Sequence, residues 1–268
     1  MGQIVDVMKF EMLKNRKKFL ILVIFVTLIA ILSVFLPPLV SDQPQPAEIS
    51  QFLAGNFGFF SFFVIIGACA YGGSLIADEF DKKTCYMLFP KVSKARLFIG
   101  KVLSQYILFA LNLLVYYVFL AIAAVVNYEQ PIPVTFLWSY LIAILYGGML
   151  FSFVVLLSSF LRSTSLTVIV AFLLLFLGFS MVTGIVTLLA YEVEPLFDIT
   201  YYYNMITAVI DFPDPRFQDI VVPVDEGIEF TVRSWFSPVI NTGVIFCSIY
   251  LTIFLMVAYL RFQNRESK

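Results

Sequence analysis

Six long apolar runs constrain this chain of 268 residues more than any other feature, and their interiors contain no Asp, Glu, Lys, Arg or His. A bilayer core about 30 Å thick is spanned by about 20 apolar residues in helical conformation. The runs that meet this length are residues 19–40, 57–77, 102–126, 136–161, 166–190 and 239–260. The sequence therefore predicts an all-α membrane protein, with six transmembrane helices in a single domain over residues 19–268.

Composition excludes a soluble globular protein. Hydrophobic residues make up 61% of the chain and charged residues 13%, whereas soluble domains are about 45–50% apolar and about 25% charged. Such a chain cannot cover its surface with polar groups, so we expect its outer surface to contact lipid. It has three cysteines, without a C-x-x-C pair, and no histidine. That inventory argues against a metal site or a disulfide framework.

The distribution of charge predicts the orientation in the membrane. Fifteen of the 17 Lys and Arg residues lie on one side of the predicted spans, in residues 1–18, 78–101, 162 and 261–268. Twelve of the 18 Asp and Glu residues lie on the other side. By the positive-inside rule, both termini are cytoplasmic. The absence of a cleavable leader and of N-x-[ST] sites favours a prokaryotic plasma membrane.

Two segments outside the spans are predicted to contact the membrane surface. Residues 1–18 form an amphipathic pattern, with Ile4, Val5, Met8 and Met12 on one face, and we expect an interfacial helix. The outer segment 191–238 carries three consecutive tyrosines, 201–203. Tyrosine favours the headgroup layer, so part of this segment is expected to lie on the outer interface or to dip into it.

The cytoplasmic loop 78–101 has the most informative pattern. Asp78, Glu79 and Asp81 would begin a short helix, where the helix dipole favours negative charge, and Pro90 would end it. One side of this helix is apolar and carries Phe80, Thr84, Met87 and Leu88. On these grounds alone, the loop could equally be an ordinary amphipathic connection whose Lys and Arg residues only set the topology.

The same loop resembles that of the permeases of ABC (ATP-binding-cassette) type-2 exporters. The matching positions are Glu79, Asp81, Thr84, Leu88, Pro90, Ser93, Lys94, Gly100 and Lys101. The layout also resembles that family, with an N-terminal interfacial helix, six spans and a long outer segment before the last span. The chain departs from the family pattern at Lys83, where glycine is common, and by one extra residue after Pro90.

This resemblance implies that the loop contains a coupling helix docked on a cytoplasmic ATPase subunit. The residues it assigns to ATPase coupling are Glu79, Phe80, Asp81, Lys83, Thr84, Leu88 and Pro90. Glu79 and Asp81 would hold the helix, and its apolar side would fill a groove on the ATPase. The resemblance further implies two ATPase copies, which carry ATP and Mg²⁺, and a second permease copy, identical or different.

The chain lacks the motifs of an enzyme. Its only Gly-Lys pair, Gly100-Lys101, is followed by Val102 rather than by Ser or Thr, so there is no P-loop. No H-E-x-x-H or G-x-S-x-G motif is present. The uncharged spans argue against a secondary carrier, although Asn112 and Tyr116 leave that alternative open. A non-transporting scaffold that holds a cytoplasmic partner also remains possible.

The resemblance places the translocation path along the second and fifth spans. The candidate path residues are Phe59, Phe62, Phe63, Phe172, Phe176, Phe179 and Thr183. An uncharged path of this kind suits a lipid-like, amphipathic, drug or peptide cargo rather than a small hydrophilic ion. The alternative interpretation is that each phenylalanine simply packs in the core or faces lipid.

Overall fold

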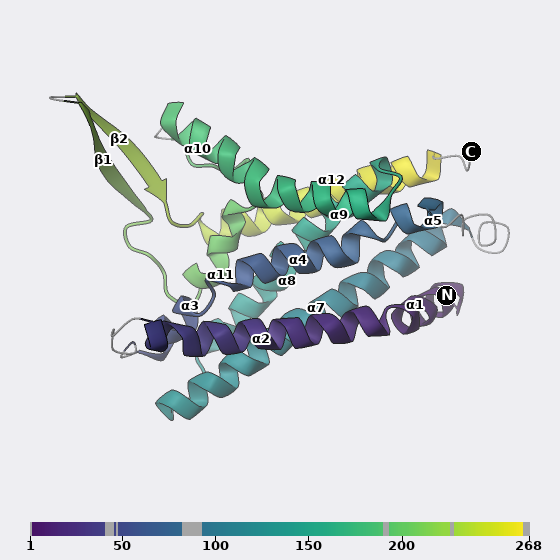
Figure 1. Ribbon diagram of the computed structural model, residues 1–268, viewed down its shortest axis with the longest axis horizontal. Coiled ribbons are helices and arrows are strands. Elements are labelled where there is room, and N and C mark those ends of the chain that lie inside the picture. The colour runs from purple at the N-terminus through teal and green to yellow at the C-terminus, as the bar shows by residue number, and fades with distance from the viewer. Residues whose placement is uncertain are drawn as a thin grey trace.

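A computed structural model of the chain describes residues 2–40, 46, 48–81, 93–189, 193–225 and 228–264. The fold is a bundle of long helices with one β-hairpin (Figure 1). The helices of the candidate spans and of their extensions are α1 (Gly2–Lys14), α2 (Arg16–Val40), α4 (Phe60–Gly73), α5 (Ala77–Asp81), α7 (Lys94–Tyr128), α8 (Val134–Phe160), α9 (Thr164–Leu173), the π-helix η1 (Leu174–Gly178), α10 (Phe179–Leu189) and α12 (Ile240–Asn264).

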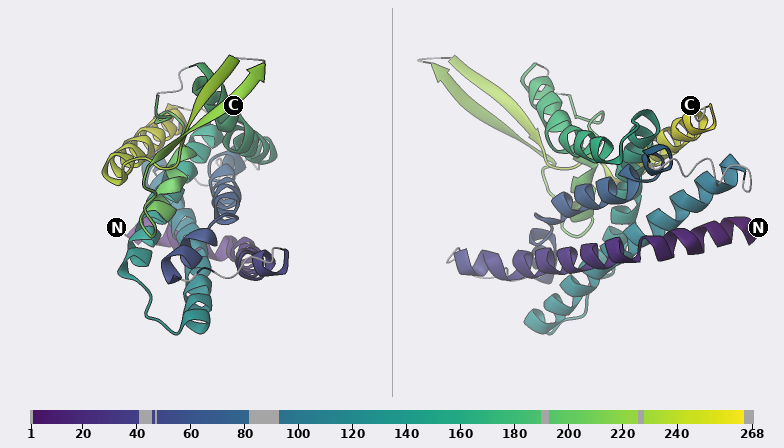
Figure 2. Two further views of the ribbon diagram at one scale, coloured as in Figure 1. Left: turned by 90° about the vertical axis from the view of Figure 1, so that its left-hand side faces the viewer. Right: turned by 45° about the vertical axis from the view of Figure 1, so that its right-hand side comes forward.

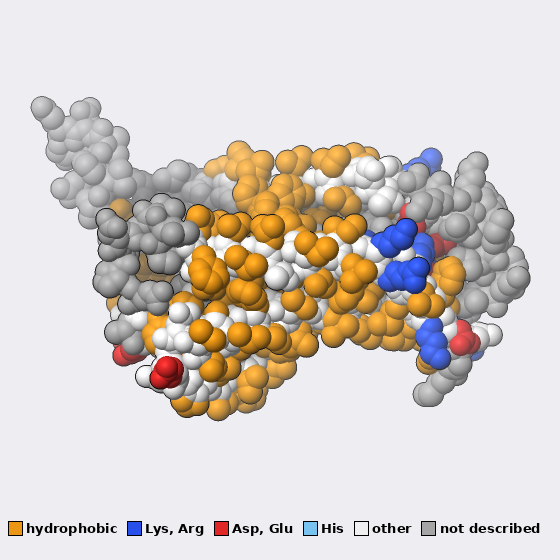
Figure 3. All heavy atoms as spheres, turned by 60° about the horizontal axis from the view of Figure 1, so that its bottom comes forward, with side chains coloured by type: hydrophobic (Ala, Val, Ile, Leu, Met, Phe, Trp, Pro, Cys, Tyr) orange, Lys and Arg blue, Asp and Glu red, His pale blue; other side chains and the backbone are white. Residues whose placement is uncertain are grey.

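The predicted number of spans is confirmed. Six helical segments in the described part of the chain are long and apolar enough to cross a membrane. They are Arg16–Leu36, Phe60–Glu79, Lys94–Tyr128, Val134–Phe160, Thr164–Thr187 and Ile240–Asn264. Both ends of the chain lie at the same end of the bundle, as an even number of spans requires (Figure 1). Apolar side chains cover the middle of one face, and Lys and Arg gather at that same end (Figure 3).

Helix α8 lies at the centre of the bundle and contacts α4, α7, α9 and α12. Glycines on α8 allow two of these neighbours to approach closely. A Cβ atom added to Gly147 would lie 3.0 Å from the Phe109 ring of α7, and one added to Gly148 would lie 3.0 Å from Leu251 of α12. In lipid, where close packing rather than the hydrophobic effect drives helix association, small residues at such contacts stabilise the bundle.

Helix α7 is longer than a bilayer requires. Its 35 residues correspond to about 52 Å at 1.5 Å per residue, whereas the hydrocarbon core is about 30 Å thick. Helix α1 packs along α7 and continues nearly in line with α2 (Figures 1 and 2). The helix predicted over residues 1–18 is therefore present as α1 and the start of α2, and its placement in the membrane interface stays a prediction.

The outer connections carry short elements. Helix α3 (Ile49–Gly55) follows the first span, and η2 (Tyr201–Tyr203) and α11 (Asn204–Ala208) precede the hairpin. Tyr201 and Tyr202 are buried, and α11 contacts α8 and α12. The tyrosines predicted to favour the headgroup layer thus pack within the protein at this end of the bundle.

The expectation of an all-α fold was wrong in one segment. Strands β1 (Phe217–Asp225) and β2 (Ile228–Trp235) form an antiparallel hairpin, in which Phe217 pairs with Trp235 and Ile220 with Val232. The hairpin projects away from the helices (Figures 1 and 2). The sequence explains why strands form here. Residues 228–233 alternate between apolar and polar, which is the period of a strand rather than of a helix.

Candidate functional site

The structure describes the first part of the predicted coupling segment. Glu79 lies in the short helix α5, together with Phe80 and Asp81, whose side chains are outside the described residues. Lys83, Thr84, Leu88 and Pro90 also lie outside them. The coupling roles of all these residues stay predictions. What the structure does establish is how the base of the loop, Asp78 and Glu79, is attached to the rest of the protein.

The second span is broken just before the loop. Helix α4 ends at Gly73 and α5 begins at Ala77, so the turn between them leaves backbone groups without helical partners. The Ser158 hydroxyl of α8 accepts hydrogen bonds from the backbone N–H groups of Ile76 (3.1 Å) and Ala77 (2.9 Å). It donates one in return to the carbonyl of Gly73 (3.2 Å). A single buried serine therefore fixes the geometry of the break.

A lysine of the first span also binds to backbone and side-chain groups at this break in the second span. Lys18 of α2 donates hydrogen bonds to the carbonyl of Ala70 (2.9 Å) and to the hydroxyl of Ser74 (3.0 Å). Ala70 belongs to the last turn of α4, where carbonyl groups lack intrahelical partners and the helix dipole favours a positive charge. The Lys18 ammonium meets both requirements at once.

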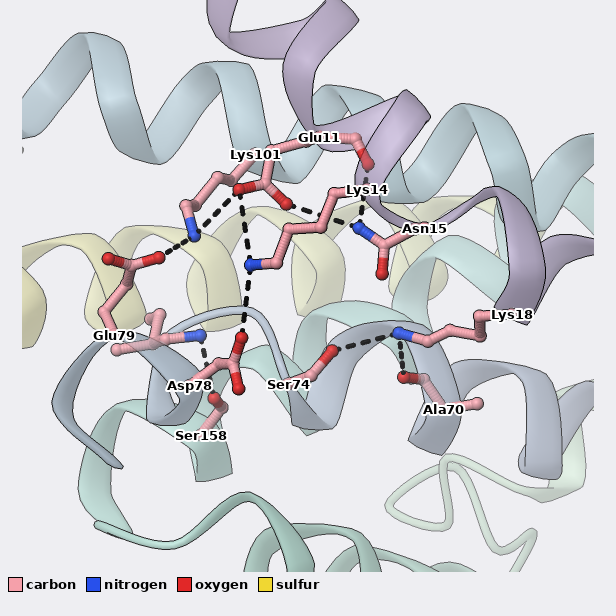
Figure 4. A network of polar contacts seen from close by, with 11 residues as sticks. Glu11, Lys14, Asn15, Lys18, Ala70, Ser74, Asp78, Glu79, Lys101 and Ser158 are labelled. Carbon is pink, nitrogen blue, oxygen red and sulfur yellow. Dashed lines mark hydrogen bonds and ion pairs between the residues drawn. The ribbon is translucent and has the colours of Figure 1, made fainter. Parts of the chain in front are cut away.

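Ion pairs join the base of the loop to α1 and α7 (Figure 4). The ammonium of Lys101, on α7, lies 3.2 Å from the Glu11 carboxylate of α1 and also pairs with Glu79 of α5. The ammonium of Lys14 lies 3.2 Å from Asp78 and 3.8 Å from Glu11. We call these five residues the loop-base network. It connects three segments that are far apart in the sequence.

Within the loop-base network, the ion pairs of Lys101 are closed to solvent, whereas the side chain of Lys14 is 37% exposed. The side chains of Lys101 and Glu11 are each 5% exposed, and that of Glu79 is 2% exposed. Burial alone would lower the pKa of Lys14, but the nearby carboxylates of Glu11 and Asp78 outweigh it and raise the pKa above its ordinary value. Because removal of one member of a buried ion pair typically costs about 3–5 kcal/mol, the contacts of Lys101 with Glu11 and Glu79 hold the loop base firmly in place.

Close packing brings the charges of α1 within reach of α7. A Cβ atom on Gly100 would lie 2.8 Å from the Val7 side chain and 3.3 Å from the carbonyl oxygen of Ile4. Only glycine at this position lets the two helices approach so closely. Arg96 of α7 also donates a hydrogen bond to the Gln3 side chain (2.6 Å). Gly100 and Lys101, which matched the family pattern, therefore act together, because one permits the approach and the other pairs across it.

The structure brings some of the candidate path residues together. Phe172 and Phe176 stack with their ring centroids 5.5 Å apart, and Phe62 of α4 contacts both rings edge-on. Phe179 packs on Phe153 of α8 instead. The second and fifth spans thus meet through a small aromatic cluster, as their assignment to one path would require.

The remaining candidate path residues lie elsewhere. Phe63 is fully buried and contacts Phe60, so it belongs to the packed core rather than to an open path. Phe59 is exposed at the start of α4. Thr183 donates a hydrogen bond to the Asp198 carboxylate (2.6 Å), which joins α10 to the outer segment.

Three of the residues that organise these sites were not singled out in the sequence. Glu11 is 68 positions before Glu79 and 90 before Lys101, so no local spacing connects them. Ser158 is one of several serines in its span, and Asp198 lies in the long outer segment. One signal in the sequence points to Glu11, because it is one of two acidic residues in a mainly basic stretch and lies on the α1 face that also carries Ile4.

Comparison with known proteins gives one clear match. The family model described as "ABC-2 family transporter protein" matches residues 8–267. This range includes all six spans and both sites described above. A search of curated proteins found no match.

Proposed function

Because the chain belongs to the ABC-2 transporter family, whose model covers residues 8–267, we propose that it is the permease subunit of an ATP-driven exporter. ATP hydrolysis would take place on a separate cytoplasmic ATPase, since the chain itself has no P-loop. The proposed complex contains two permease copies and two ATPase copies in a plasma membrane, with the permease termini on the cytoplasmic side.

The loop-base network is the observation that carries this proposal. A coupling loop transmits force only if its base is attached to the spans that must move. Asp78 and Glu79 are attached to α1 through Lys14 and to α7 through Lys101. A displacement of loop 82–92 by the ATPase would therefore be transmitted through α5 to α1 and α7.

The outer faces of the last two spans support a second permease copy. The share of the apolar stretch that is buried within the chain differs strongly between spans. It is 72% in the second span but only 11% in the fifth and 17% in the sixth. Exposed side chains on α10 and α12 include Met181, Ile185, Ile249 and Ile253. Lipid or another permease can cover these faces, and a path between two copies requires the latter.

Two polar side chains inside the third span form structural hydrogen bonds through their donor groups. Asn112 donates a hydrogen bond to the Tyr71 hydroxyl (2.7 Å), and Tyr116 donates one to the carbonyl of Asn56 (2.6 Å). Neither group is charged, so neither offers the ionisable site that an ion-coupled carrier usually uses. This favours ATP-driven transport over the carrier alternative.

The first experiment is purification of the tagged chain from native membranes in mild detergent, followed by mass spectrometry of what accompanies it. We expect a stoichiometric P-loop ATPase. Replacement of residues 82–92 by a Gly/Ser segment of equal length should release this ATPase. The same replacement of the outer turn 129–133 should leave it bound. Purification of the chain alone, or with a partner that lacks a nucleotide site, would refute ATP-driven transport and favour the scaffold alternative.

A further inference from the structure

The outer end of the fifth span borders a hollow of about 770 Å³. It is lined by residues of α10 and by residues 198–204 of the outer segment. This volume is within the range of small-molecule binding sites, about 300–1,000 Å³. The hollow is open to the outside rather than enclosed in the core, so a ligand could enter it without unfolding the segment.

The carboxylate of Asp198 borders this hollow although the residue is only 4% exposed. One of its oxygens accepts hydrogen bonds from the backbone N–H (2.7 Å) and the hydroxyl (2.6 Å) of Thr200. The other accepts a hydrogen bond from the Thr183 hydroxyl of α10 (2.6 Å). Every partner in this set is neutral.

No described Lys or Arg residue forms an ion pair with Asp198. Arg216, the basic residue of the same outer segment that forms an ion pair nearby, lies 3.9 Å from Glu194 instead. A buried carboxylate without a cation is costly, because hydroxyl and amide donors replace only part of its hydration. The Asp198 charge therefore remains available to attract a cation into the hollow.

The other walls of the hollow combine apolar and hydroxyl groups. Met181 and Ile185 of α10 and the ring of Tyr201 contribute apolar surface, and Thr187 adds a hydroxyl close to that of Thr183. The hydroxyl of Thr187 donates a hydrogen bond to the carbonyl of Thr183 (2.8 Å). Among the residues that line the hollow, Asp198 is the charged one. A ligand with an apolar body and one positive charge is complementary to this arrangement.

We propose that this hollow binds amphipathic cations and that Asp198 selects them over neutral or anionic compounds of the same shape. The inference rests on the proposed function and deepens it, because it names the chemical class of the cargo at the outer end of the path. The competing explanation is purely structural: the Asp198 carboxylate would only order the turn at Thr200 and attach it to Thr183.

A pair of probes with nearly the same shape and opposite charge separates these explanations. Tetraphenylphosphonium is an apolar cation, and tetraphenylborate is its anionic counterpart. We would measure equilibrium binding of each to the purified detergent-solubilised complex. The wild-type protein should bind the phosphonium at least about tenfold more tightly than the borate, because an opposite charge near a partly buried carboxylate contributes more than 1.4 kcal/mol.

Three variants test the residues involved. Asp198→Asn should abolish this preference while leaving the shape of the hollow unchanged. Gly184→Trp should block both probes, because Gly184 borders the hollow and a Cβ atom there meets nothing within 4 Å. Asp211→Asn is the matched control, since Asp211 is an exposed carboxylate of the same outer segment that does not border the hollow.

Each outcome decides the proposal. Loss of the phosphonium preference in Asp198→Asn and of phosphonium binding in Gly184→Trp, with Asp211→Asn unaffected, supports it, whereas an unchanged preference in Asp198→Asn overturns it. If Asp198→Asn does not fold, the Gly184→Trp result and the probe preference of the wild-type protein decide it. Equal binding of the two probes, binding of neither, or phosphonium binding unaffected by Gly184→Trp overturns it. Copurification of the ATPase is independent of all these results, so failure of this proposal is distinguishable from failure of the proposed function.

Discussion

The ammonium of Lys101 lies 3.2 Å from the carboxylate of Glu11, at a point where each side chain is only 5% exposed. This contact joins α7 to α1 in a buried position, beside the base of loop 82–92. The same ammonium pairs with Glu79, so one lysine serves two carboxylates from distant parts of the chain. Residues of the loop base are therefore held from two sides rather than by their own helix alone.

Replacement of Lys101 by Gln should lower the free energy of unfolding by about 3–5 kcal/mol, because it leaves Glu11 and Glu79 buried without their shared cation. Thermal unfolding in detergent would measure the loss. Lys9→Gln, which removes the same charge from an exposed position on α1, is the control and should change little. Adding Glu79→Gln to the Lys101 variant should restore part of the stability, and a Lys101 variant as stable as the control would contradict the assigned role.

Replacement of Gly100 by Val should separate α1 from α7, since the new side chain would overlap both Val7 and the backbone at Ile4. Overpacking of this kind typically costs about 1–3 kcal/mol. Cysteine crosslinking between α1 and α7 should be weaker in Gly100→Val, because the two helices lie further apart. Adding Val7→Ala to this variant should restore part of the crosslinking, because it makes room for the new side chain. Gly58→Ala, at a position where a Cβ atom meets nothing within 4 Å, should behave like the wild-type protein. Crosslinking in Gly100→Val as strong as in the wild-type protein would contradict the prediction.

Replacement of Ser158 by Ala should loosen the break in the second span. Two buried N–H groups, those of Ile76 and Ala77, would lose their acceptor, and each such loss costs about 1–3 kcal/mol. Hydrogen exchange at these two amides should become faster. Ser152→Ala is the matched control, because this buried serine of the same helix donates only to its own Met149 carbonyl (2.7 Å). Equal exchange rates in the two variants would show that Ser158 does not hold the break.

The contribution of Lys14 to stability should disappear at alkaline pH. Its pKa is raised in the folded protein, so the contribution is fully present below the unfolded-state pKa and is lost as the pH rises through the folded-state pKa. The stability difference between the wild-type protein and Lys14→Met should therefore be constant from neutral pH to about pH 10 and shrink above it. A difference that shrinks already between pH 6 and about pH 9 would assign it to another group.

The spans could be predicted from the sequence because lipid imposes a requirement that each segment meets by itself. Apolar residues over the length of a bilayer suffice, whatever the neighbours are. The loop pattern likewise identified Gly100, Lys101 and Glu79, which belong to one contiguous stretch. The contact of Lys101 with Glu11 was beyond such reasoning, since it arises only when α1 is packed on α7.

Other features were missed for different physical reasons. The alternation in residues 228–233 has the period of a strand, but the tyrosines of the same segment favour a position at the membrane surface and indicate no sheet. Asp198 acquires its significance from Thr183 of the fifth span, to which it is bonded across 15 positions. Phe63 was grouped with Phe62 as a path residue, although adjacent positions on a helix point about 100° apart and only Phe62 contacts the aromatic cluster.

The serine at the break in the second span also bears on whether water enters the interrupted helix. A transporter that leaks protons or ions dissipates the gradients of its cell, and an interrupted helix with open backbone groups is a natural place for a water thread to form. Here Ser158 accepts from Ile76 and Ala77 and donates to Gly73, while Lys18 bonds the carbonyl of Ala70. These backbone groups are therefore satisfied by the protein itself, and none of them requires a water molecule at the break.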